Sequence, residues 1–384
     1  MLTITTPDGT EIGVDLKTIV TDSLAALTKV HGDIKRRQFI SWLTRLGVEN
    51  TLAKIIKYLI EDRVTEEPGT GGWSKTASKY VELIYGTKAA NAIYESMTDT
   101  ALAVEAIKSF EHFINYSHRD YEIKTLDDSL REYLDKRWNS QKGDAGTLKS
   151  GTAGFHMERD HLRHTAMIAR IFGQIPELRR NLGKTAEYLN KRILEMNAND
   201  WQGEKIATPV AVYVAIKNIE KYGKYLSLEA IDKIKQITID ETISRYDSDM
   251  KGWHSGPFKE VALSFYTLFL LAEMPEIWLS DSILRKQMEE SLKSLLGLMI
   301  HSPHGYGLPV YGMSYPDIGL SCLMISALLQ KPVRNRGEED SLLKLIEFVV
   351  KGIESGEQQY WANTYSWTVS YFVRDVCKVL TDSK

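Results

Sequence analysis

Two kinds of helical segment alternate along most of the chain. One kind is amphipathic, as in residues 288–296, where charged and apolar positions recur at helical spacing. The other kind is apolar on nearly every side, as in residues 261–272. A helix without a polar face has to be enclosed, whereas an amphipathic helix can cover it and face water. We therefore predict an inner set and an outer set of helices.

The two kinds are joined by loops that carry glycine and an aromatic residue. The aromatic markers are Phe155, Trp201, Trp253, Tyr306 and Trp361, which are 46, 52, 53 and 55 residues apart. Such even spacing is typical of a repeated supersecondary unit, here outer helix, loop and inner helix. The outer helices are expected at residues 130–138, 185–196, 230–245, 288–300 and 341–353, and the inner helices at 101–113, from 161 onward, and at 208–219, 259–272, 315–329 and 364–380.

The N-terminal part of the chain has a different pattern. Residues 2–14 alternate in polarity around the turn signal Pro7-Asp8-Gly9, and we expect the one β element of the protein there, a small hairpin. Helices are expected at 16–30, 34–46 and 51–61, before a break rich in glycine at 66–73. These features predict an N-terminal hairpin and helical cap over residues 1–68 and a larger helical domain over 69–384. Its five or six hairpins could close into a ring or stack as an open solenoid.

Composition narrows the function classes. Apolar residues make up 43% and charged residues 26% of the 384, with a net charge of −3, which gives no electrostatic reason for nucleic-acid binding. No run reaches the ~20 apolar residues of a membrane span, and no signal peptide is evident at the N-terminus. The two cysteines, Cys322 and Cys377, lie in apolar helical patterns, so we expect buried free thiols and a cytoplasmic location.

The loops carry a family resemblance. Gly71-Gly72-Trp73, Lys251-Gly252-Trp253 and Gln358-Gln359-Tyr360-Trp361 each precede an expected inner helix, and this resembles the glycine-tryptophan repeats of the α/α-toroid proteins. That group includes terpenoid and squalene cyclases and the catalytic subunits of protein prenyltransferases. The resemblance covers about residues 70–380 and implies an all-α fold, an α/α toroid of five or six helical hairpins.

The catalytic motifs of that group are missing. The proton-donor motif of class II cyclases would need an acid at Met250, after Asp247 and Asp249. The metal-binding motif of ionising terpene synthases is broken at Arg131, and the zinc-ligand spacing of the prenyltransferases is absent as well. Whether the protein is an enzyme therefore stays open.

The resemblance implies a site where the N-termini of the inner helices meet at the mouth of the ring. The candidate catalytic residues there are Asp99, Asp160, His161, His164, Glu260 and Asp317. The candidate ligand-binding aromatics are Trp253, Tyr306, Tyr315, Trp361 and Trp367. Carboxylates at helix N-termini also cap free N–H groups without any catalysis, and aromatics also wedge loops together, so both explanations are retained.

No cofactor is predicted. A divalent metal held by Glu158, Asp160, His161 and His164 is the alternative, which the absence of a His-Glu-x-x-His signature disfavours.

Two functions follow from this reading. The first is a protein with a central cavity, rimmed by carboxylates, histidines and aromatics, that binds and in one version acts on a small molecule such as an isoprenoid or a glycan. The alternative is a non-catalytic module on the same ring that binds a protein partner. The sequence does not predict an oligomeric state.

Overall fold

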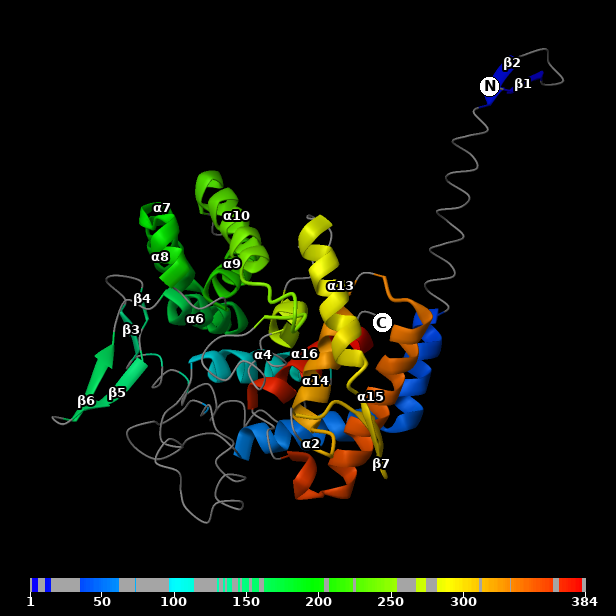
Figure 1. Cartoon of the computed structure of the whole chain (residues 1–384). Coiled ribbons are helices and arrows are strands. Elements are labelled where there is room, and N and C mark those ends of the chain that lie inside the picture. The colour runs from blue at the N-terminus through cyan, green and yellow to red at the C-terminus, as the bar shows by residue number, and fades with distance from the viewer. Residues whose placement is uncertain are drawn as a thin grey trace.

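The computed structural model shows a mostly helical protein (Figure 1). The structure describes residues 2–5, 11–14, 35–61, 73, 97–113, 130, 134, 137–139, 144–145, 147–151, 154–158, 162–203, 207–223, 226–253, 267–273, 282–310, 313–331, 333–361 and 366–381. The expected helix at residues 16–30 lies outside these ranges.

The labelled elements follow one another along the chain. The helices are α2 (Val48–Glu61), α4 (Met97–Phe113), α6 (Leu162–Gln174), η2 (Pro176–Asn181), α7 (Leu182–Glu195), α8 (Ala198–Gly203), α9 (Ala207–Lys221), α10 (Leu228–Ser244), α13 (Ser282–Leu296), α14 (Ile318–Gln330), α15 (Arg336–Ser355), η3 (Gln358–Trp361) and α16 (Ser366–Thr381). The strands are β1 (Leu2–Thr5), β2 (Glu11–Val14), β3 (Trp138–Asn139), β4 (Asp144–Ala145), β5 (Thr147–Gly151), β6 (Gly154–Glu158), β7 (Ile300–Ser302) and β8 (Gly305–Gly307). Residues 35–46 and 267–273 are helical too.

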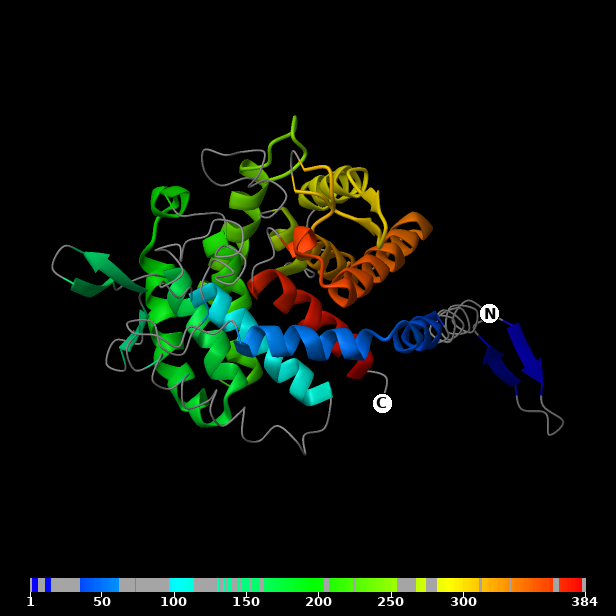
Figure 2. The same ribbon diagram turned by 90° about the horizontal axis from the view of Figure 1, so that it is seen from below.

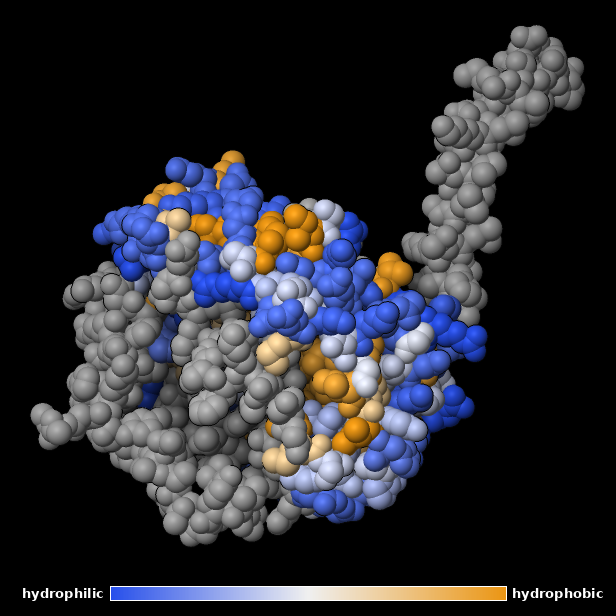
Figure 3. Space-filling model, in the orientation of Figure 1, coloured by the Kyte–Doolittle hydropathy of each residue, from blue (hydrophilic) through white to orange (hydrophobic). Residues whose placement is uncertain are grey.

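The expected contrast between inner and outer helices is confirmed. Residues 318–328 of α14 are buried without exception, and so are residues 267–273. By contrast, the outer helix α13 buries one stripe that includes Leu284, Met288, Leu292 and Leu295. Over the outer helices the surface is mainly hydrophilic (Figure 3). The distribution of apolar residues around each predicted helix therefore correctly indicated which helices are enclosed and which cover them.

Local signals explain where several helices begin and end. In α15 the side chain of Asn335 accepts a hydrogen bond from the Glu338 N–H at 3.0 Å, and Glu338 accepts one from the Asn335 N–H at 2.9 Å. This reciprocal capping box satisfies two N–H groups that the helix cannot pair internally. The helix ends at Gly356, whose φ of 69° is left-handed and favours glycine.

The inner helices pack on one another in a fixed order. Helix α4 contacts α6, α6 contacts α9, and α14 contacts α16. Helix α16 also packs along α4, although more than 250 residues separate them in the sequence. Figure 1 and Figure 2 both show these two helices side by side. Helix α2 packs against α4, α15 and α16; the domain boundary expected at residue 68 stays a prediction.

Two tryptophans of the repeat loops tie an outer helix to the inner helix that follows it. The indole N–H of Trp253 donates to the carbonyl of Thr242 in α10 at 2.7 Å, and its backbone N–H donates to Thr267 Oγ1 at 2.9 Å. For Trp73 the acceptors are the Leu59 carbonyl in α2 at 2.7 Å and Thr100 Oγ1 in α4 at 3.0 Å. At these two positions the tryptophan thus braces one helix against the next.

Three sequence-based expectations need correction. The β1–β2 hairpin is present but is not the one β element, because β3–β4, β5–β6 and β7–β8 are further antiparallel pairs. The segment 301–309, whose glycines and prolines by themselves predict a long loop that could fold over the mouth of the ring, forms β7–β8 for most of its length and packs on α15. The outer helix expected at 288–300 instead spans Ser282–Leu296, and Ile300 belongs to β7.

Candidate functional site

The first turns of α4 and α6 lie together, as the rim hypothesis requires. Arg163 donates from Nη2 to Thr98 Oγ1 at 3.1 Å, which joins the two helix starts. Next to these residues lie two predicted site residues, the buried Asp99 and the half-buried His164, each the third residue of its helix. The structure therefore places Asp99 and His164 at neighbouring helix starts.

Asp317 serves as a helix cap. Its side chain accepts a hydrogen bond from the Leu320 N–H at 2.8 Å at the start of α14, and the residue is 2% exposed. A carboxylate in this position satisfies a free N–H and interacts favourably with the helix dipole. This capping role accounts for an acid at that place without chemistry.

Several predicted site residues lie outside the described residues. Asp160, His161 and Glu260 are among them, and so is the side chain of Glu158, although its backbone belongs to β6. Within the described ranges, no group of three or more histidine, cysteine, aspartate or glutamate side chains is placed to hold a metal ion. The predicted quartet at Glu158, Asp160, His161 and His164 is thus not tested.

The predicted aromatic residues have different surroundings. Trp253 is fully buried and uses both of its N–H groups in the brace, so it offers no surface to a ligand. Tyr306 is 41% exposed on β8, where it stacks edge-on against His301 and lies 5.2 Å from Lys344 Nζ of α15. It therefore lies beside an outer helix. Tyr315 is half-buried just before α14, and the side chain of Trp361 is outside the described residues.

Trp367 is the predicted aromatic with the most suitable position. It is half-buried at the second position of α16, with its ring 6.5 Å from Phe269 and 6.2 Å from Tyr371. Phe269 and Tyr371 are 6.4 Å apart, and all three pairs are close to perpendicular. Edge-to-face contacts of this kind are favourable for aromatic rings. We call Phe269, Trp367 and Tyr371 the aromatic triad.

A buried network of charged groups lies next to the triad, between four inner segments. Arg170 of α6 forms a bidentate pair with Glu105 of α4, at 2.6 and 2.7 Å, and also donates to Glu273 at 3.3 and 3.2 Å. Arg374 of α16 donates to the same Glu273 at 3.2 Å and to the neighbouring Asp375 at 2.7 and 3.1 Å. Arg170 is 1% exposed and Glu273 is 6% exposed, so these ions are withdrawn from water.

Tyr371 links the network to the triad. Its hydroxyl donates a hydrogen bond to Glu273, and the guanidinium of Arg374 lies 4.6 Å from its ring centre. We use the name buried ionic network for Glu105, Arg170, Glu273, Tyr371, Arg374 and Asp375.

The network lies at one depth in the bundle of inner helices. Glu105, Arg170 and Arg374 are each the ninth residue of their helix. At a rise of 1.5 Å per residue this is about 12 Å from the helix start. Arg163 and Thr98 near the helix starts, and Arg170 and Glu105 below them, are both 65 residues apart in sequence. A constant separation means that α4 and α6 run parallel.

Electrostatics keep the network charged. Burial alone would raise the pKa of Glu273, but the Arg170 and Arg374 guanidinium groups outweigh burial and lower it. Burial opposes the charge of both arginines, yet the pKa of Arg170 is raised by Glu105 and Glu273, and that of Arg374 by Asp375 and Glu273. Burial and the adjacent Glu273 raise the pKa of Tyr371 well above its usual value, so the phenol stays a donor.

The sequence analysis missed this network, although a signal for it was present. Glu105 and Arg170 are single charged residues inside apolar helical runs, and Glu273 follows directly on another such run. A charged residue is almost never fully buried without a partner, so opposite charges in separate enclosed helices predict pairing. Every charge in the network has a partner of opposite sign. We therefore interpret the network as a rigid structural element that lies below the helix starts.

No protein-family model matches the chain, and no curated protein matches it.

Other features of the structure bear on the sequence-based expectations. None of the described helices is both long and apolar enough to cross a membrane. Cys322 and Cys377 are buried free thiols, as expected, and burial raises the pKa of both.

Proposed function

We propose that the protein is an α/α toroid whose inner helices close into a ring. The packing of α16 on α4 supports closure, because it joins the last inner helix to the first. The braces at Trp73 and Trp253 support a repeated hairpin unit. An open solenoid has no reason to bring its two ends into contact.

We further propose that the mouth of this ring binds a small amphipathic molecule with an anionic head and an apolar body. The proposal rests on the order in which cationic, aromatic and ion-paired side chains follow one another from the N-terminal ends of the inner helices. Arg163 and His164 lie at the start of α6, the aromatic triad is formed by α16 and the segment 267–273, and the paired ions lie further along the helices. Helix N-termini and a guanidinium attract anions, and aromatic rings pack against an apolar chain. Isoprenoid diphosphates have this chemistry, and glycans share only the aromatic part.

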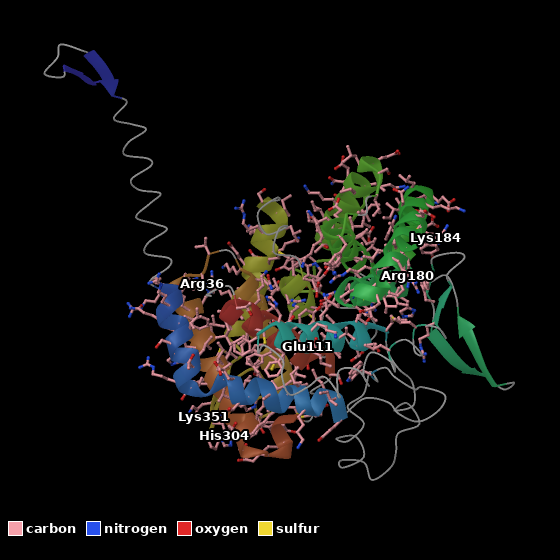
Figure 4. The ribbon with its side chains drawn as sticks, turned by 180° about the vertical axis from the view of Figure 1, so that it is seen from behind. Arg36, Glu111, Arg180, Lys184, His304 and Lys351 are labelled. Atoms are coloured by element: carbon pink, nitrogen blue, oxygen red, sulfur yellow. The ribbon has the colours of Figure 1, made fainter. Side chains whose placement is uncertain are left out.

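The test is a calorimetric titration of the protein with farnesyl diphosphate and, separately, with an oligosaccharide. We expect farnesyl diphosphate to bind, Trp367→Leu to weaken binding about tenfold or more, and Arg163→Gln to weaken it about tenfold, equivalent to ~1.4 kcal/mol. Arg180→Gln is the matched control, because the side chain of Arg180 is exposed in η2, away from the helix starts that carry Arg163 (Figure 4). Circular dichroism of each variant verifies that it is folded.

The competing function is a non-catalytic interaction module. Its specific support is the internal pairing of the buried ionic network, which leaves no charge in it unpaired for a substrate. Absence of binding by either ligand, with all variants folded, would reject the small-molecule proposal and favour this alternative. A cytoplasmic location remains our expectation, supported by the two free thiols.

A further inference from the structure

Trp201 departs from the bracing pattern of the other repeat tryptophans. It is 1% exposed, yet no atom of the described chain accepts a hydrogen bond from its indole N–H. The carbonyls of Leu194 and Met196, at and just after the end of α7, both accept from Lys233 Nζ of α10 at 2.9 Å. Leaving a buried donor without an acceptor costs folding free energy and is rare in proteins, so we expect this N–H to have a partner.

Trp201 is one of the residues that line a cleft of about 580 Å³. The cleft runs between the α7–α8 junction and α10, and its lining includes Met196, Asn197, Trp201, Gln236, Ile237 and Asp240. Its volume is within the range of roughly 300–1,000 Å³ that is typical of small-molecule sites. Apolar surface from Met196, Trp201 and Ile237 is combined with a few polar groups, as in such sites generally.

Most charged groups around the cleft already have partners, so the ligand has to supply only a donor for the remaining carboxylate. The cation of the cleft, Lys233, already donates to two carbonyls, and Glu241 is paired with Arg245. Asp240 is exposed on the α10 side of the cleft. In the described part of the chain its carboxylate accepts a hydrogen bond from the uncharged side-chain amide of Gln236, at 2.8 Å. A ligand that pairs with both walls therefore needs one acceptor for the indole N–H and one donor for Asp240. A secondary amide supplies a C=O and an N–H in fixed opposite directions.

We propose that this cleft binds a small neutral molecule that carries a secondary amide next to an apolar group. The amide oxygen accepts from Trp201 Nε1, the amide N–H donates to Asp240, and the apolar group packs against Met196 and Ile237. Because Trp201 is 1% exposed, binding requires a lining side chain to move, and we assign this movement to the exposed side chain of Gln236. Acetamido sugars and N-acylated amino acids share this chemistry.

The experiment follows the indole N–H signals of the ¹⁵N-labelled protein by NMR, with Trp201→Phe used to assign the Trp201 signal. N-acetylglucosamine and N-acetylleucine methylamide are titrated separately up to roughly 50 mM, which distinguishes the two sources. We expect a saturable downfield shift of the Trp201 signal with at least one of them. Asp240→Asn should weaken that binding about tenfold, equivalent to ~1.4 kcal/mol. No saturable shift with either probe means that a water molecule fills the cleft, and overturns the proposal.

A second measurement tests the unpartnered donor itself. Trp201→Phe and Trp253→Phe remove the same atoms, but Trp253 loses a hydrogen bond at 2.7 Å and Trp201 loses none in the described structure. We therefore expect the melting temperature to fall clearly less for Trp201→Phe than for Trp253→Phe. An equal fall would mean that the Trp201 N–H has an acceptor within the protein, and would overturn the proposal. Neither result depends on ligand binding at the mouth of the ring.

Discussion

Replacing Arg170 by methionine should destabilise the protein more than almost any other single change. Glu105 would lose its bonds of 2.6 and 2.7 Å and keep only Arg374, whose nearest nitrogen is 3.7 Å away. Glu273 would lose its bonds to Arg170 and keep those to Arg374 and Tyr371. The network would contain three buried carboxylates and one guanidinium. Removing one partner of a buried pair costs about 3–5 kcal/mol, and we expect a loss of that size.

Urea unfolding followed by circular dichroism measures this loss, with the free energy of unfolding obtained from the midpoint and the slope. Arg180→Met makes the same change on the exposed outer side and should cost less than about 0.5 kcal/mol. Combined with Glu105→Gln, the Arg170→Met change should be non-additive, because the charge left unpaired on α4 is then gone. We expect a coupling energy of about 1–3 kcal/mol.

Two results would refute this reasoning. A loss below about 1 kcal/mol for Arg170→Met would show that water or a side-chain rearrangement solvates Glu105, so that the network is not sealed. Simple additivity of the two changes would show that Arg170 and Glu105 do not interact in solution as they do in the structure.

Four further predictions concern the inner helices, one hairpin and the outer helix α7. The pKa of Glu273 is lowered below the ordinary 4.5 in the folded protein, so this carboxylate stabilises the fold above that pH. The urea midpoint should therefore fall as the pH drops from 4.5 through the folded pKa. The Glu273→Gln variant should show a weaker dependence of the midpoint on acid pH. Leu268→Ala should cost about 2–5 kcal/mol in urea unfolding, because the side chain is fully buried; a loss well under one would contradict its inner position. In Gly307→Ala the new Cβ would lie 2.5 Å from the Phe348 ring, so we expect a loss of about 1–3 kcal/mol. Gly183→Ala, which meets no atom within 4 Å in the part of the chain described, should instead stabilise α7 by about 0.5–1 kcal/mol, and thermal melts that reversed this order would be inconsistent with the structure.

The sequence predicted the helices well because helix burial leaves a periodic trace in one segment. Residues 267–273, for example, are apolar on every face apart from Thr267 and Glu273, and all are buried. The buried ionic network leaves no such trace, because Glu105 and Arg170 meet only when α4 and α6 pack side by side. A periodicity argument evaluates each segment alone and cannot pair charges across segments.

The candidate site and the β7–β8 hairpin show the same difference between what a single segment predicts and what depends on packing. Asp317 was correctly placed at a helix start, but a cap and a catalytic acid have the same sequence signal at that position. In β7–β8, Gly305 and Gly307 suggested an irregular loop, whereas Gly305 has a φ of 118° at the turn and Gly307 leaves room for Phe348. Only the packed structure distinguishes a glycine required for a close approach from a glycine in an open loop.

The packing of α16 on α4 has a consequence for how the chain is made. The two helices are separated by about 250 residues, so at ~5–20 residues per second a ribosome needs roughly 13–50 s to synthesise the partner of α4. During that interval the apolar side of α4, including Leu102 and Phe110, lacks its final cover. Contacts of such long sequence separation also slow folding. The nascent protein is therefore expected to need a chaperone that shields α4 until α16 has emerged.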